Sequence, residues 1–146
     1  MANTASVATD LQLQPYIFFY GRCEEALEFY KRVFGGTYEA MRVKDTPMAD
    51  KMPAEARDKI MHASFKSPSI SFLASDGRDS KVIDPDAGNI SLALSTTNAP
   101  EAERIFKALS DGGKITMPLD DAFWGGRFGT VNDRFGNEWL VTILES

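Results

Sequence analysis

The chain has 146 residues, of which 43% are hydrophobic and 25% charged, and its net charge at pH 7 is −5. This length suits one domain, and ten Phe, four Tyr and two Trp can bury enough apolar surface to argue against a disordered chain. The acidic balance, without a concentrated basic patch, predicts no nucleic-acid binding. No apolar run approaches the roughly 20 residues that span a bilayer, so no membrane segment is expected. Cys23 is the only cysteine, which favours the reducing cytoplasm.

The first half of the chain predicts one strand, one helix and three further strands. A strand-like run at residues 16–20 precedes an amphipathic helix at 25–33, which ends near a glycine pair. Three short runs follow, rich in β-branched, aromatic or small residues: 37–44, 59–66 and 69–75. Residues 45–58 contain two prolines and predict a long loop with a short helical turn at 54–57.

The second half repeats this order. Glu101 stands 76 residues after Glu25, and the helix that it opens carries apolar residues at the same spacing as the first. A strand-like run at 90–94 precedes this helix. Three runs follow it: 114–117, 128–132 and 138–144. The repeat predicts an α+β fold in which residues 1–146 form a single domain. Its parts are a βαβββ module at 11–75, a linker at 76–88 and a second βαβββ module at 89–146.

Six segments together resemble one known family. They are QPYIFFYG (14–21), EALEFY (25–30), FGG (34–36), FWG (123–125), GTV (129–131) and DRFGNEW (133–139). The chain thus resembles the PhnB-like family of the glyoxalase/bleomycin-resistance/dioxygenase (vicinal oxygen chelate) superfamily, often labelled 3-demethylubiquinone-9 3-methyltransferase-like. The resemblance implies a concave mixed sheet made by the two modules, a homodimer, and a cleft for a small-molecule ligand.

Metal-binding members of this superfamily use His and Glu ligands at set positions. Counting along the family pattern places Pro15 and Ser91 at the two His positions and Leu140 at a Glu position. The fourth position, near residues 72–75, offers no His, Glu or Cys, although Asp76 follows closely. Pro and Leu side chains cannot ligate a metal, and Ser is a poor ligand for first-row metals. We therefore predict no metal and no cofactor.

Alternation along the strands predicts which residues share the cleft face. If Pro15 and Ser91 face the cleft, then Ile17, Phe19, Ala93 and Ser95 do too, whereas Tyr16, Phe18, Leu92 and Leu94 pack under the helices. By the same rule Glu138 and Thr142 share the face of Leu140, and Trp139 does not.

Four residues stand out as candidates for function, each with a plainer structural alternative. His62, the only histidine, is either an acid/base or anchor in the cleft or a half-buried strand residue. Phe123 and Trp124 lie in a Gly-flanked loop and are either an aromatic wall for a flat ligand or a hydrophobic plug or dimer contact. Glu138 is either a cleft carboxylate that acts as a base or a solvated residue at the rim.

Three functions remain open, and the sequence leaves undecided whether the chain is an enzyme. The first is a metal-free small-molecule binding protein with a cleft lined by Phe19, His62, Phe72, Phe123, Trp124 and Glu138. The second is a cofactor-independent lyase or isomerase in which His62 or Glu138 moves a proton. The third is a metal-dependent lyase or dioxygenase, against which the missing ligands argue.

Overall fold

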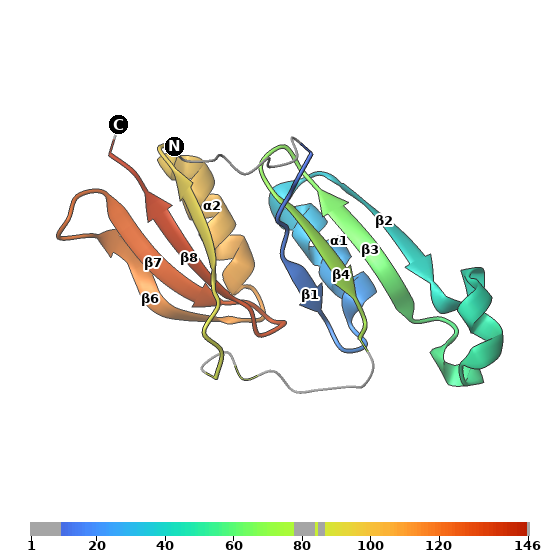
Figure 1. Ribbon diagram of the computed structural model, residues 1–146. Coiled ribbons are helices and arrows are strands. Elements are labelled where there is room, and N and C mark those ends of the chain that lie inside the picture. The colour runs from blue at the N-terminus through green and yellow to red at the C-terminus, as the bar shows by residue number, and fades with distance from the viewer. Residues whose placement is uncertain (1–9, 78–83, 85–86, 146) are drawn as a thin grey trace, which may run out of the picture. The chain divides into compact units, whose positions relative to one another are not determined.

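The structure is a computed structural model that describes residues 10–77, 84 and 87–145. The elements follow each other as β-α-β-β-β twice, and the strands form two four-stranded mixed sheets, so the predicted α+β class and the tandem βαβββ order are confirmed (Figure 1). Contacts divide the chain into two compact units. Unit 1 comprises Met1–Cys23 and Gly36–Arg78, and unit 2 comprises Glu24–Gly35 and Asp79–Ser146. Within the predicted linker, residues 78–83 and 85–86 lie outside the described part of the chain.

Unit 1 contains sheet A, with strand order β1-β4-β3-β2. Its strands are β1 (Tyr16–Phe18), β2 (Thr37–Arg42), β3 (Ile60–Lys66) and β4 (Ser71–Ser75). β1 runs parallel to β4, and the other neighbours are antiparallel. One face of the sheet is buried and carries Ala63, Phe65, Phe72 and Ala74, with the rings of Phe65 and Phe72 stacked 4.9 Å apart.

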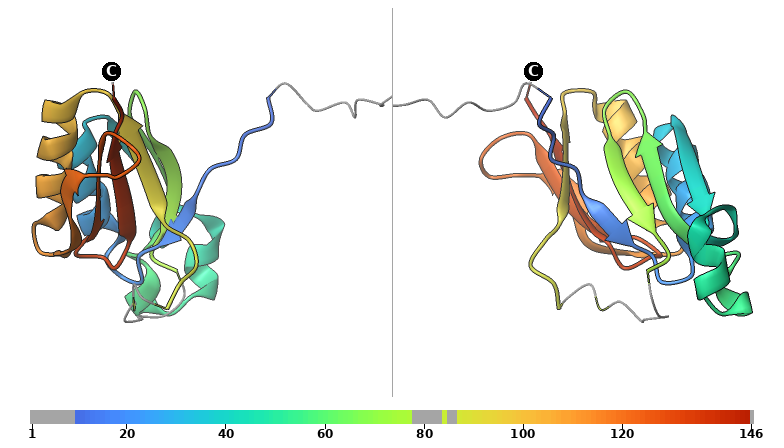
Figure 2. Two further views of the ribbon diagram at one scale, coloured as in Figure 1. Left: turned by 90° about the vertical axis from the view of Figure 1, so that its left-hand side faces the viewer. Right: turned by 45° about the vertical axis from the view of Figure 1, so that its right-hand side comes forward.

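The segment between β2 and β3 differs from the expected loop with a single turn. It forms three short 3-10 helices, seen at the end of sheet A in Figure 2. These are η1 (Val43–Asp45), η2 (Pro47–Lys51) and η3 (Ala54–Ala56). β2 therefore ends at Arg42 rather than at the expected Lys44, because Val43 is buried and already opens the first of these turns.

Asp76, expected in the linker, has a structural role at the end of β4. It is buried, and its two carboxylate oxygens accept hydrogen bonds from the backbone N–H groups of Cys23 (2.8 Å) and Ile60 (2.7 Å). The first bond gives a partner to a backbone N–H in the first turn of helix α1 (Cys23–Phe34), where a negative charge is also favourable. Asp76 thereby ties the end of β4 to the start of that helix and to β3.

Unit 2 contains sheet B, with strand order β5-β8-β7-β6. Its strands are β5 (Leu92–Thr96), β6 (Lys114–Asp121), β7 (Arg127–Asn132) and β8 (Glu138–Ile143). β5 is parallel to β8, and the other pairs are antiparallel. Helix α2 (Ala99–Ser110) covers one face of this sheet (Figures 1 and 2) and buries Ala102, Phe106 and Leu109. Its first turn is capped by Asn98, whose side chain accepts a 3.1 Å hydrogen bond from the N–H of Glu101.

The core of unit 2 is organised around the buried carboxylate of Asp133, in the turn between β7 and β8. One oxygen accepts hydrogen bonds from the hydroxyl of Tyr30 and from the indole N–H of Trp139 (2.8 Å). The other accepts from the backbone N–H groups of Phe135 (2.9 Å) and Asn137 (3.0 Å). The Asn137 side chain in turn donates to the Tyr30 hydroxyl at 3.0 Å. Four donors compensate the cost of burying this carboxylate.

This network explains why helix α1 belongs almost entirely to unit 2, together with sheet B. Tyr30 is fully buried, and its ring lies 5.8 Å from that of Phe135 and 5.9 Å from that of Trp139. One turn later on the helix, Phe34 lies 5.3 Å from the Trp139 ring. By sequence order α1 belongs to the first repeat, but these aromatic contacts hold it to the β7–β8 turn.

Tyr30 makes folding sensitive to alkaline pH. Burial first, and then the negative charge of Asp133, raises the pKa of Tyr30 well above its ordinary value of about 10. The neutral phenol is favoured in the folded state, so its stabilising effect is complete below about pH 10 and declines as pH rises from there towards the folded pKa.

We predict that the free energy of unfolding falls more steeply above about pH 10 in the natural chain than in Tyr30→Phe. At neutral pH the variant should lose about 1–3 kcal/mol, because the Asp133 carboxylate loses a buried donor. Urea unfolding of both proteins from about pH 8 to about pH 11 measures both effects. Parallel pH profiles for the two proteins would contradict the assigned role of Tyr30.

Candidate functional site

Sheet A carries exposed aromatic side chains on the face opposite its buried one. The strand register places Tyr16, Phe18, Met41, His62, Ser64 and Leu73 on this open face of sheet A. Thr37, Glu39, Lys66, Ser71 and Ser75 share the same face. Tyr16 and Phe18 are 40% and 49% exposed, and their ring centroids lie 5.1 Å apart. The ring of His62 lies 5.9 Å from that of Tyr16. The half-buried imidazole thus stands at the edge of a row of exposed rings.

The predicted faces of β1 are wrong. Tyr16 and Phe18 were expected to be packed and Phe19 to be open, but Phe19 is only 5% exposed. The register explains the reversal, because Tyr16 lies beside Leu73 on β4, one residue along from the buried Phe72. A shift of one residue in the phase of alternation moves every side chain to the other face. Phe19 and Phe72, predicted to line the cleft, are both buried, and Tyr16 and Phe18 are presented instead.

In sheet B the predicted alternation matches the structure. Trp139 is 3% exposed and lies in the core, as expected, with Val141 and Ile143 on the same side. The open face of sheet B carries Ala93, Ser95, Phe128, Thr130, Leu140 and Thr142, which are half-buried or exposed and lie in directly opposed positions on β5, β8 and β7. Ser95, Thr142 and Phe128 form one row across the three strands.

Phe123 and Trp124 form the tip of the hairpin between β6 and β7, at the end of these strands in Figure 1. The loop is closed by hydrogen bonds from the N–H of Ala122 to the carbonyl of Gly126 (2.9 Å) and from the N–H of Gly125 to the carbonyl of Ala122 (3.0 Å). Gly125 has φ +100°, a backbone conformation that side-chain-bearing residues rarely adopt, so the turn favours glycine there.

The two rings of this tip are exposed. Phe123 is 97% exposed and Trp124 58% exposed. Trp124 contacts Phe123 edge-on with ring centroids 4.8 Å apart, and its ring lies 5.6 Å from that of Phe128 on the open face of sheet B. The tryptophan therefore stands against the sheet face, whereas Phe123 extends into solvent.

Glu138 lies at the other end of strand β8. Its carboxylate accepts a hydrogen bond from the hydroxyl of Ser91, the residue that stands at a family His position. Thr142 follows Glu138 by four residues, roughly 13 Å along the strand. It lies beside Phe128, whose ring Trp124 contacts. Glu138 and Trp124 thus share a sheet face but do not meet. The remaining polar candidate, His62, belongs to unit 1.

Sequence reasoning missed several residues of these surfaces. The strand containing Tyr16 and Phe18 is apolar at every position, so its pattern gives no indication of which side is open. Phe128 could have been found, since it lies two residues from Thr130 and alternation gives both the same face. The position of Met41 depends on its pairing with His62 across β2 and β3, which no local pattern shows.

The residues at the superfamily's metal positions do not fit a divalent metal. The carbonyl of Pro15 accepts the N–H of Leu73 (2.8 Å) and its side chain has no donor atom, and Leu140 has none either. The Ser91 hydroxyl is engaged with Glu138, and both oxygens of Asp76 are engaged with backbone N–H groups. Within residues 10–77, 84 and 87–145, no three or more His, Cys, Asp or Glu side chains gather as a metal site would require.

In the same described ranges, no helix has the length and apolar character needed to cross a membrane.

Comparison with known proteins gives a family and several solved folds. Residues 12–142 match the family model described as 3-demethylubiquinone-9 3-methyltransferase. The crystal structure of protein PA1353 from Pseudomonas aeruginosa is 39% identical, with 94% of this chain and 100% of that chain covered and a TM-score of 0.79.

Two more distant structures share the fold. The PhnB protein from Bacillus cereus is 24% identical, with 90% of this chain and 98% of that chain covered and a TM-score of 0.71. A member of the glyoxalase/bleomycin resistance protein/dioxygenase superfamily from Sphaerobacter thermophilus is 17% identical, with coverages of 90% and 97% and a TM-score of 0.51.

We predict that the purified protein carries no stoichiometric divalent metal and that a chelator leaves its melting temperature unchanged. The reason is the donor set: Pro15, Ser91 and Leu140 supply no good ligand. Elemental analysis, together with melting curves with and without chelator, checks this. One tightly held zinc, nickel or manganese ion per chain would overturn the prediction.

Proposed function

The chain belongs to the family described as 3-demethylubiquinone-9 3-methyltransferase, a PhnB-like branch of the glyoxalase/bleomycin-resistance superfamily, and on this basis we propose that it binds a flat, partly apolar small molecule without the superfamily's divalent metal. The observation that carries the proposal is the exposed ring of Trp124 beside Phe128 on the open face of sheet B. Large apolar side chains left exposed together at a sheet face are typical of ligand sites.

The row of Phe128, Thr142 and Ser95 beneath Trp124 supplies both the aromatic and the polar contacts that a flat, partly apolar ligand needs. Phe128 offers a ring next to the indole, and the hydroxyls of Thr142 and Ser95 follow in the same row. An aromatic ligand stacked on Trp124 would direct its polar edge to these hydroxyls, which can donate or accept hydrogen bonds. The loop that carries Trp124 is short and held by two backbone hydrogen bonds, so little ordering is needed on binding.

Sheet A offers a second surface of similar composition. His62 lies beside Tyr16, and Phe18 and Tyr20 continue the row, with 6.2 Å between their ring centroids. In this proposal the imidazole serves as a polar anchor next to the tilted rings of Tyr16 and Phe18, the role that the sequence suggested for it. Tyr16 and Phe18 replace Phe19 and Phe72 as the apolar lining.

One contact favours a second candidate function, a cofactor-independent lyase or isomerase. The Ser91 hydroxyl holds the Glu138 carboxylate in a fixed orientation, as a general base requires. With a ligand in hand, exchange of its carbon-bound protons in deuterated solvent separates the two functions. A binding protein returns the ligand unlabelled, whereas an enzyme would introduce deuterium and lose this activity in Glu138→Gln.

The two tryptophans provide a matched pair of variants. Trp124→Ala should weaken ligand binding by roughly 1–3 kcal/mol and cost little stability, because the ring is exposed in the free protein. Trp139→Ala should destabilise the fold by about 3–5 kcal/mol, because it removes a buried ring and a donor to Asp133. Melting temperature and native mass can be measured before any ligand is known. If Trp124→Ala unfolds as readily as Trp139→Ala, or dissociates a dimer, the ligand wall is ruled out.

We further propose a homodimer in the cytoplasm. The compartment is inferred from the single, buried cysteine, Cys23. The dimer is inferred from strand β6, at the edge of sheet B, where Ile115 and Met117 are 45% and 50% exposed. Light scattering at micromolar concentration should give about twice the 16.1 kDa mass of one chain. A mass near that of one chain would exclude the dimer.

A further inference from the structure

A β-bulge in sheet A places two methionines next to the only histidine of the chain. Met41 on β2 pairs with His62 on β3, but the next residue, Arg42, pairs with Ile60. Met61 is therefore the extra residue of the bulge. Bulges bend a strand and redirect side chains, and they are common beside functional sites.

The burial pattern shows that alternation is interrupted at this point. Ile60 and Ala63 are 2% and 1% exposed, whereas Met61 and His62 between them are both half-buried. In a regular strand Met61 would share the buried face of Ala63. The bulge instead leaves Met61 accessible beside His62.

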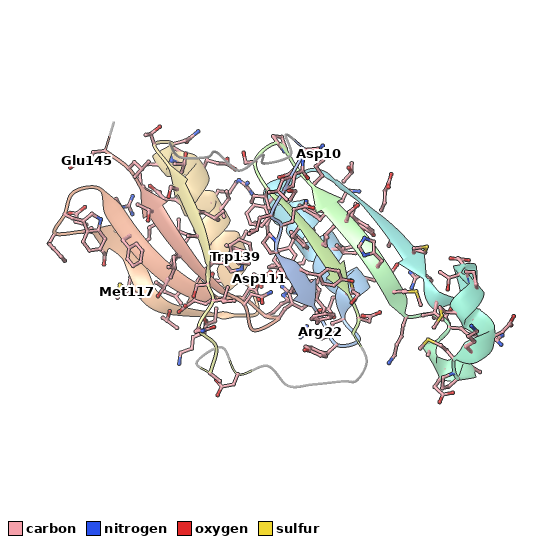
Figure 3. The ribbon with its side chains drawn as sticks, viewed as in Figure 1. Asp10, Arg22, Asp111, Met117, Trp139 and Glu145 are labelled. Carbon is pink, nitrogen blue, oxygen red and sulfur yellow. The ribbon has the colours of Figure 1, made fainter. Side chains whose placement is uncertain are left out.

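Met41 completes the group from the neighbouring strand. Directly opposed residues in an antiparallel pair have Cβ atoms about 4.5–5.5 Å apart, so the thioether of Met41 and the imidazole of His62 can reach one point. Met41 is 44% exposed, which is not the behaviour of a methionine that fills a gap in a core. Met117, labelled in Figure 3, lies on β6 of unit 2 and is not part of this group.

We propose that Met41, Met61 and His62 form a binding site for a soft monovalent metal ion, copper(I). Thioether sulfur is a soft ligand that selects copper(I), and imidazole nitrogen also suits copper. The three donors are neutral, so they do not offset the charge of a divalent ion, and they lack the carboxylates that magnesium, calcium or manganese prefer. The Tyr16 ring, 5.9 Å from that of His62, limits the orientations of the imidazole.

This site is separate from the superfamily's divalent position and from the open face of sheet B. It shares His62 and Tyr16 with the surface of sheet A, but it uses no residue of the row beneath Trp124, and Pro15, Ser91 and Leu140 take no part in it. Its failure would leave the proposed ligand face of sheet B untouched, and a protein without that ligand function could still hold the ion.

The test is competition for copper(I) under anaerobic conditions against the chromophoric chelator bicinchoninate, with ascorbate as reductant. The natural chain should remove one copper(I) per chain from the chelator. Met41→Leu, Met61→Leu and His62→Gln should each weaken binding by about 10- to 100-fold or more, since loss of even an outer partner of a metal site has effects of this size. Leu conserves the volume of Met, so melting temperatures should stay close to that of the natural chain.

Three methionines outside the group serve as controls. Met117→Leu, Met48→Leu and Met52→Leu should bind copper(I) as the natural chain does. Silver(I), added to protein labelled at the methionine methyl groups, should shift the NMR signals of Met41 and Met61 and leave that of Met117 in place. The proposal is overturned if the natural chain cannot compete with the chelator, or if the control variants lose as much affinity as the three site variants.

Discussion

The carboxylate of Asp133 is the point at which helix α1, the β7–β8 turn and strand β8 are joined. Its four donors come from the Tyr30 hydroxyl, the Trp139 indole and two backbone N–H groups of the turn. A buried carboxylate is stable only when such partners surround it, so each partner's position constrains the others. With Trp139 fixed on the core side of β8, the neighbouring Leu140 and the alternate Thr142 must face the opposite side. The open face of sheet B is thus a consequence of the buried network.

Sequence patterns predicted correctly which side chains of sheet B are buried, but for β1 of sheet A they exchanged the buried and the open side. The difference has a physical reason. In β5 large Leu residues alternate with Ala93 and Ser95, so size indicates which side packs. In β1 the residues around Ile17 are all large and apolar, and either phase would bury a ring. The phase is then decided by pairing with β4, a contact between residues more than fifty positions apart. The order of the elements needed only local periodicity and was predictable.

The candidate site was predictable to a similar degree. Trp124 and Glu138 were expected to line one cleft. Glu138 shares the strand face of Leu140, and the Trp124 ring lies beside Phe128, but the distance between them along β8 depends on the register with β7. The capping role of Asp76 and the position of Met61 in a bulge could not be foreseen. Asp76 caps a helix that begins 53 residues earlier, and Met61 leaves its expected face through a bulge that has no signature in the sequence.

The two tryptophans have opposite environments: Trp139 lies in the core, and Trp124 lies against the open face of sheet B, where we propose that the ligand binds. The two indole N–H signals of a nitrogen-15-labelled sample test this directly. The Trp139 signal, from a buried group bonded to Asp133, should exchange with deuterated water as slowly as the most protected amides, and the exposed Trp124 signal should disappear at once. Aromatic probe compounds should shift only the Trp124 signal. Rapid exchange of both signals, or probe-induced shifts of Trp139 alone, would contradict the account.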